Sequence, residues 1–310
     1  MTDGYRALRE TAGWIDLSSR GRIRVTGEDR GRLLHAMTTN HIKDLVPGTG
    51  CYVFFLNAVG RVLADANILS FDDYLLIDTE PESGPFLMEH LDKYIIADDV
   101  VLEDISRTTA CFSLEGPRAA DLAEGAGLPV PAGPLSHLAA GDQTVIAATT
   151  TGAPGLRVIA PVSAANPFNR AVAASATDAA VVRLEHFFPR YGDDITQANL
   201  PQETGVADAL HFNKGCYLGQ EIVERVRSRG HVNRTLVGLR VEGRDPLPRG
   251  AKVLFEGSEV GETTSSAYSP ALNATLAMAY VRVNAAKPET AVVADGRAAQ
   301  TAAIKSSRTA

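Results

Sequence analysis

The chain has 310 residues, of which 45% are hydrophobic and 22% charged, a composition typical of a globular protein rather than a disordered or fibrous one. Because this length exceeds that at which a single hydrophobic core usually stops growing, we expect two or three domains. The net charge of −7 argues against a general nucleic-acid-binding or anionic-membrane-binding protein, since phosphate groups are bound by a surplus of lysine and arginine.

The first two thirds of the chain predict two α/β units in succession. In the first unit we expect a strand, a helix, a hairpin, a strand, a helix and a strand, at residues 21–27, 28–40, 51–69, 73–78, 86–95 and 99–105. In the second we expect three strands and two helices, with the strands near residues 110–116, 144–149 and 156–161 and the helices near 117–125 and 166–179.

After Arg234 the pattern changes to short strands and tight turns without helical periodicity, which predicts a small closed β-barrel. The predicted fold class is therefore α+β, with two mixed α/β lobes at residues 1–115 and 116–233 and a C-terminal β-barrel at 234–310. The first residues lack a basic stretch followed by an apolar one, and the most apolar run, residues 51–59, is too short to span a bilayer. We expect a cytoplasmic protein without membrane contact.

The three cysteines, Cys51, Cys111 and Cys216, are widely separated and form no Cys-x-x-Cys pair. Without a secretory signal, an odd count predicts reduced thiols rather than a disulfide framework. One chain also cannot supply the four thiolates of a typical iron-sulfur cluster, so we predict no resident metal site. Cys51 and Cys111 lie in apolar, strand-like runs and are predicted to be inert core residues.

Cys216 is placed differently, in the stretch "NKGCYLGQEIVERV" at residues 213–226. A helix is expected to begin at Gly219, Gln220 and Glu221, so Cys216 should lie in the loop that leads into it. The helix N-terminus and the ammonium group of Lys214 favour a thiolate, which indicates a reactive or ligand-contacting thiol. The alternative is a loop cysteine beside an ordinary helix start.

These residues resemble a known family. The stretch from Lys214 to Glu221 is here called the signature segment. It resembles the motif of the YgfZ group of folate-dependent proteins, which act in iron-sulfur protein maturation. The residues that match this motif are Lys214, Gly215, Cys216, Tyr217, Gly219, Gln220 and Glu221. Segments such as "VVRLEHFFPRYGDDI", "LPQETG" and "NRTLVGL" resemble, in order and spacing, the glycine-cleavage aminomethyltransferase, the parent of that superfamily. The resemblance implies a GcvT-like ring of two lobes closed by a barrel, with tetrahydrofolate in a central channel.

One departure from the transferase pattern concerns its catalytic aspartate. The resemblance implies a pair of acidic residues after the turn that contains Asn57, with the catalytic group first, but this chain has Ala64 followed by Asp65. A methyl group cannot assist proton transfer or stabilise a cationic centre. Asp65 can replace the missing acid only if the alignment shifts by one residue, and strand alternation then predicts that it faces the opposite side, as a solvent-exposed residue.

The resemblance also implies folate contacts. Glu203 is the expected pterin anchor, because a carboxylate pairs with the pterin amide and amino group, and Arg234 is the expected folate-contacting cation. Asn57 and Asp65 are further candidates, although Asn57 is better suited to shaping its own turn than to contacting a ligand. His211, five residues before Cys216, is a possible but unsupported partner of the thiol.

The sequence therefore predicts a tetrahydrofolate-binding protein that supports assembly or repair of iron-sulfur clusters in client enzymes, with Cys216 as its key thiol and Lys214 as its charge partner. Its expected partners are folate and iron-sulfur client or assembly proteins. The alternatives are an aminomethyltransferase of the glycine-cleavage type, which Ala64 opposes, and a non-catalytic folate-sensing module, which would not need Cys216.

Overall fold

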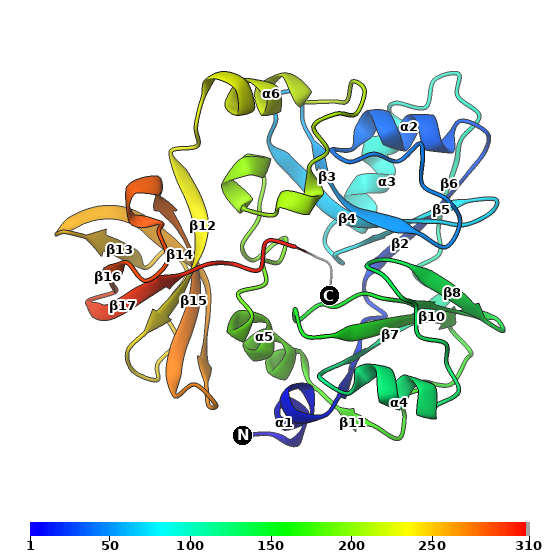
Figure 1. Cartoon of the computed structure of the whole chain (residues 1–310). Helices are drawn as coiled ribbons and strands as arrows, with labels where there is room; N and C mark the ends of the chain where they lie inside the picture. Colours follow the sequence, from blue (N-terminus) through cyan, green and yellow to red (C-terminus); the bar gives the residue numbers. More distant parts are fainter. Residues whose placement is uncertain (308–310) are drawn as a thin grey trace.

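The computed structural model describes residues 1–307, apart from the side chain of Arg229. Two β-sheets with their helices and one closed β-barrel form three bodies around a central region (Figure 1). This confirms the predicted α+β architecture of two mixed lobes and a C-terminal barrel.

The first lobe is built on an antiparallel sheet with the strand order β3-β4-β5-β2-β6. Its strands are β2 (Gly21–Thr26), β3 (Gly50–Leu56), β4 (Val62–Ser70), β5 (Leu75–Thr79) and β6 (Val101–Asp104). The helices α2 (Arg30–Met37) and α3 (Gly84–Asp92) bury their apolar faces against one side of this sheet, in a core shared with β2, β3 and β4. These elements agree with the predicted ones, because their apolar residues recur at the expected spacing.

The second lobe contains a six-stranded sheet in the order β11-β1-β7-β10-β9-β8. Its strands are β1 (Gly13–Asp16), β7 (Thr109–Glu115), β8 (His137–Ala140), β9 (Gln143–Ile146), β10 (Gly155–Pro161) and β11 (Val172–Ala173). Because β1 pairs with both β7 and β11, residues 13–16 belong to this sheet. The predicted boundary between residues 115 and 116 therefore does not coincide with the boundary between the two sheets, because β1 and β7 precede it in the sequence but belong to the sheet of the second lobe.

The helices of the second lobe are α1 (Asp3–Glu10), α4 (Ala119–Gly125) and α5 (Ala176–Glu185). The helix predicted at residues 166–179 is wrong, because the chain becomes helical only at Ala176. Ser175 caps this start: its hydroxyl accepts a hydrogen bond from the Asp178 amide at 3.1 Å, and the Asp178 carboxylate accepts one from the Ser175 amide at 2.9 Å. This reciprocal capping box satisfies two amide groups that the first helical turn leaves unpaired.

The barrel begins at Arg234, the residue at which the sequence predicts it. Its strands are β12 (Arg234–Val241), β13 (Lys252–Phe255), β14 (Ser258–Ser269), β15 (Ala274–Arg282), β16 (Ala291–Ala294) and β17 (Arg297–Ala302). The pairing of β12 with both β15 and β17 closes the barrel around its own apolar core.

Residues 186–233 connect the second lobe to the barrel and contain η1 (Pro201–Thr204), η2 (Ala207–Ala209) and α6 (Gln220–Arg229). This connection packs on the first lobe, although the sequence assigns it to the second. The amide of His211 donates to the Thr39 carbonyl and the amide of Leu218 donates to the Ala36 carbonyl, both at 3.0 Å. The signature segment is thereby fixed at the end of α2.

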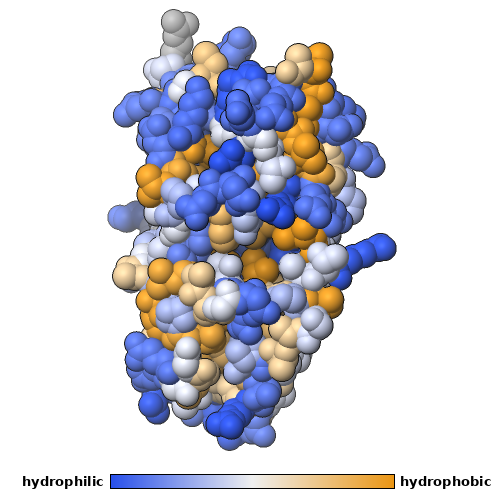
Figure 2. All heavy atoms as spheres, turned by 90° about the vertical axis from the view of Figure 1, so that its right-hand side faces the viewer, coloured by the Kyte–Doolittle hydropathy of each residue, from blue (hydrophilic) through white to orange (hydrophobic). Residues whose placement is uncertain are grey.

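One face of the surface is mostly hydrophilic (Figure 2). The face in Figure 2, which is the right-hand side of Figure 1, shows apolar side chains in several separate groups among hydrophilic ones. Among residues 1–307, no helix has the length and apolar character needed to cross a bilayer.

Candidate functional site

Cys216 lies on an exposed loop immediately before α6, as the sequence predicts. Within the described part of the chain, no hydrogen bond or ion pair holds its thiol. His211 is not joined to it by a hydrogen bond and instead packs edge-on against His41, with ring centroids 5.2 Å apart. The structure thus presents this thiol to solvent on a loop whose neighbours are fixed.

Lys214 points in another direction. Its ammonium group donates three hydrogen bonds, to the carbonyl oxygens of His35 at 2.5 Å, Thr38 at 2.6 Å and Asn40 at 2.8 Å, and it lies 4.8 Å from the centre of the Tyr217 ring. Burial lowers the pKa of Lys214 to about 7; the Cys51 thiol opposes this shift and Lys43 adds to it. The carbonyl oxygens at the C-terminal end of α2 favour the ammonium form.

The other end of the signature segment is held by the turn that contains Asn57. Gly219 has a φ of +82°, and a Cβ at this position would lie 2.5 Å from the Asn57 carbonyl oxygen, so only glycine fits. The Asn57 side chain accepts hydrogen bonds from the amides of Val59 at 3.1 Å and Arg61 at 2.9 Å. Asn57 therefore shapes its own turn, which is the alternative that the sequence leaves open for it.

The remaining signature residues also serve the loop. The Gln220 side chain accepts a hydrogen bond from the Tyr217 amide at 3.1 Å, and Tyr217 packs partly buried against the core between the lobes. Gly215 lies close to the ring of His35, since a Cβ added at Gly215 would be 3.6 Å from the His35 Nε2. Glu221 is exposed in the first turn of α6. The segment is thus fastened by its side chains and backbone while Cys216 stays accessible.

The other two cysteines are much less available. Cys111 is fully buried and Cys51 is partly buried in the first lobe. Burial raises the pKa of the Cys51 thiol to about 12 and that of Cys111 to about 11, so both are thiols near neutral pH.

We expect iodoacetamide to alkylate Cys216 at least about tenfold faster than Cys51 or Cys111 in the native protein, because alkylation needs both exposure and the thiolate form. Mass spectrometry of the digested protein at several reaction times measures the three rates. Similar rates at all three cysteines would contradict this picture of an accessible thiol.

The sequence predicted a solvent-exposed Asp65, and this is wrong, because the residue is only 3% exposed. Its carboxylate accepts a hydrogen bond from the Tyr52 hydroxyl at 2.6 Å. The strand does alternate, but in the opposite sense: Ala64 faces the apolar core of the first lobe with Ala66 and Ile68. A carboxylate at position 64 would therefore be buried in that core. The acid at position 65 is the one that faces a cavity.

This cavity, here called the inter-lobe cavity, has a volume of about 350 Å³ and lies between β1, β4 and α5. Apolar side chains such as Ile15, Leu135 and Ala179 form part of its walls. Its polar lining includes Asp65, Asn67 and arginine side chains. Such a combination of apolar walls and a few buried polar groups is typical of small-molecule sites, which have volumes of about 300–1,000 Å³.

An ion-pair network holds the polar side of this cavity. Asp78 accepts hydrogen bonds from Arg157, from Arg20 at 2.8 Å and from Asn67 at 3.0 Å. Burial alone would raise the pKa of Asp78, but the two guanidinium groups lower it to about 2. Arg157 is 1% exposed, and its Nε has no hydrogen-bond partner among residues 1–307. Arg157 is one of the residues that line the cavity, so this buried N–H group without a partner lies close to it.

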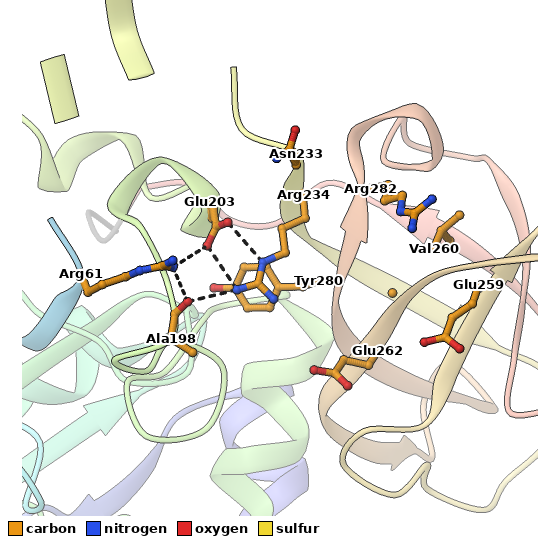
Figure 3. Close-up of a pocket in the computed structure, with 11 residues that line it drawn as sticks. Arg61, Ala198, Glu203, Asn233, Arg234, Glu259, Val260, Glu262, Tyr280 and Arg282 are labelled. Atoms are coloured by element: carbon orange, nitrogen blue, oxygen red, sulfur yellow. Dashed lines mark hydrogen bonds and ion pairs between the residues drawn. The ribbon is translucent and has the colours of Figure 1, made fainter. Parts of the chain in front are cut away.

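Glu203 and Arg234 lie together in a second cavity, here called the barrel cavity, of about 550 Å³. Figure 3 shows the Glu203 carboxylate between the side chains of Arg61 and Arg234. The Arg234 guanidinium donates to the Glu203 carboxylate at 3.2 and 3.4 Å, and the Leu200 amide donates to it at 3.0 Å. Tyr280, over whose ring Arg234 lies at 5.0 Å, is 4% exposed, and its hydroxyl has no partner among the described residues.

The structure therefore brings the predicted site residues into three places rather than one. Asp65 lines the inter-lobe cavity, Glu203 and Arg234 line the barrel cavity, and Lys214 and Cys216 line neither.

Three residues of these cavities and their hydrogen bonds were not predicted from the sequence: Tyr52, Arg157 and Tyr280. Tyr52 was recoverable from the hairpin, because its partner strand carries Asp65. Among the described residues, no group of three or more histidine, cysteine or acidic side chains is placed to hold a metal ion.

Two family models match this chain. Residues 1–140 match the GCVT N-terminal domain, and residues 234–309 match the glycine cleavage T-protein C-terminal barrel domain.

Curated relatives and a solved structure agree with these matches. A putative chloroplastic transferase of Arabidopsis thaliana is 28% identical over 268 residues, which cover 81% of this chain but only 61% of that protein. An aminomethyltransferase of Rubrobacter xylanophilus is 28% identical over 294 residues, which cover 89% of this chain and 78% of that protein. The crystal structure of aminomethyltransferase T of the glycine cleavage system from Bartonella henselae superposes with a TM-score of 0.87 over 98% of this chain and 88% of its own, at 21% identity, which shows a shared fold.

Proposed function

We propose that the chain belongs to the superfamily of the glycine-cleavage T-protein, whose N-terminal and barrel domain models match residues 1–140 and 234–309. Within it, the protein binds tetrahydrofolate and supports iron-sulfur enzymes through Cys216. The two parts of this proposal rest on different sites, and each has its own test.

The folate part rests on the inter-lobe cavity. Tetrahydrofolate supplies a carrier for one-carbon units, and its pterin presents an amide N–H and an amino group to a carboxylate. Asp65 lies on the cavity wall, and the unpartnered Nε of Arg157 offers a donor to an acceptor on the ligand. These residues fit a pterin, so we place its ring here, with Asp65 as acceptor and the apolar residues excluding water.

The alternative folate site is the barrel cavity, with Glu203 as pterin anchor and Arg234 as folate-contacting cation. There a pterin would have to replace Arg234 on the Glu203 carboxylate, because both carboxylate oxygens already accept hydrogen bonds. This exchange costs one charge-assisted contact for each one gained. The Asp65 carboxylate is also hydrogen-bonded, to Tyr52, so our preference for the inter-lobe cavity rests on its apolar walls and few polar groups, which are typical of a small-molecule site. Paired variants separate the two sites.

The iron-sulfur part rests on a single observation, the exposed thiol of Cys216 on a loop that its neighbours fasten at both ends. The surrounding residues resemble the YgfZ signature, and a folate carrier alone has no need of a fastened, accessible cysteine. Thiolates ligate the iron of such clusters, so a client's cluster, or its iron, is the partner that fits this site. The test is rescue of iron-sulfur enzyme activity, in cells lacking the protein, by the wild-type chain and by Cys216→Ser.

Aminomethyl transfer of the glycine-cleavage type is the second candidate, and the position of Asp65 favours it. Ala64 does not exclude this reaction, because the side chain at position 64 faces the core of the first lobe. A buried carboxylate in the inter-lobe cavity is a suitable group for stabilising a cationic one-carbon centre.

Under the function that we propose, the purified protein should release no measurable ammonia or methylenetetrahydrofolate from an aminomethyl-lipoyl carrier protein with tetrahydrofolate present. A bacterial aminomethyltransferase assayed in parallel is the positive control. Turnover by the wild-type chain that disappears in Asp65→Asn would instead establish aminomethyl transfer and replace our proposal.

A further inference from the structure

Lys214 is bound in a way that its place in the sequence does not suggest. An ammonium group has three N–H donors, and here all three are used by the carbonyl oxygens of His35, Thr38 and Asn40, at 2.5, 2.6 and 2.8 Å. These carbonyls lie at and just beyond the C-terminal end of α2, where a helix leaves its last carbonyl groups unpaired. A cation at this position is stabilised by the partial negative charge of the helix end.

No N–H of Lys214 is left to donate to a thiolate. The side chain turns inward, towards the end of α2 and the ring of Tyr217, whereas Cys216 is exposed. Resting on the proposed role of Cys216, we propose that Lys214 is a positioning residue, which fastens the signature segment to the end of α2 and so fixes where Cys216 is displayed, without contacting the sulfur.

Backbone contacts on both sides of Lys214 support this reading. His211 donates to the Thr39 carbonyl and Leu218 donates to the Ala36 carbonyl, so the segment crosses the helix end with Lys214 between two other attachment points. Beyond them, Gly219 meets the turn of Asn57 at a distance that excludes any side chain. Lys214 is the only one of these attachments that a point substitution removes without altering the backbone.

The experiment compares Lys214→Met, which keeps an apolar stem and removes the ammonium, with Lys43→Met as the control for loss of a nearby but exposed lysine. Hydrogen exchange of the amides of residues 211–219 should quicken at least about tenfold in Lys214→Met, because that part of the fold loses its fastening, and should stay unchanged in Lys43→Met. Thermal unfolding of both variants checks that the rest of the protein is folded.

The second readout is the pH dependence of Cys216 alkylation. We expect its midpoint to be the same in Lys214→Met and in the wild type, whereas losing a cation in direct contact with a thiolate would raise it by about one pH unit or more. A rise of that size would overturn the proposal in favour of a direct charge partner, and so would exchange rates in residues 211–219 that do not change. Neither readout uses iron-sulfur activity, so the positioning role can fail while the proposed function stands, and the reverse.

Discussion

Asp65→Asn should lose most of the stabilisation that tetrahydrofolate gives to the wild-type protein. A ligand that binds only the native state at one hundred times its dissociation constant adds about 2.7 kcal/mol, which for a chain of this length corresponds to a rise in Tm of about 5 °C. Asparagine has the shape of aspartate and can still accept the hydrogen bond from Tyr52, so the unliganded protein should change little. Its amide nitrogen, however, places a donor against the donors of the pterin, which costs binding.

Glu203→Gln is the matched control, since it makes the same chemical change in the barrel cavity. Differential scanning fluorimetry, with and without ligand, should show the full folate-induced shift in this variant and almost none in Asp65→Asn. The reverse pattern would move the pterin to the barrel cavity and restore Glu203 as its anchor. A full shift in both variants would place the ligand outside both cavities.

Much of the fold could be predicted because its signals are local. The hairpin of β3 and β4, for example, shows two β-rich runs around the turn at residues 57–60, and the start of the barrel shows a loss of helical periodicity. The pairing of β1 with β7 joins residues about one hundred positions apart, and no local pattern encodes it. The helix at residues 166–179 was wrong because an alanine-rich stretch has little periodic contrast, although Ser175 and Asp178 did carry a readable capping signal.

The orientation of Asp65 shows a physical limit of sequence patterns. Because side chains alternate along a strand, positions 64 and 65 face opposite sides of the sheet. The alternation identifies which of these sides faces the core only when the other face of the strand is polar. In β4 both faces are largely buried, one against the helices of the first lobe and one against the inter-lobe cavity, so the pattern assigns no direction.

The role of Lys214 was obscured for a related reason. Its position two residues before Cys216 suggested a charge partner, but a loop directs its side chains according to what it packs against. The carbonyl acceptors at the end of α2 come from residues about 175 positions away. The identity of the signature residues was readable from the sequence, and their contacts were not.

The measurement that tests the account most directly is rescue of iron-sulfur enzyme activity in cells that lack this protein. The wild-type chain should restore activity. Cys216→Ser should restore little or none, although it is expected to fold normally, because an exposed thiol can become a hydroxyl without loss of packing. Cys51→Ala, which changes a cysteine outside the signature segment, is the control and should rescue like the wild type. Equal protein levels and equal thermal stability establish that the comparison concerns the thiol alone. Full rescue by Cys216→Ser would contradict the claim that this thiol carries the function.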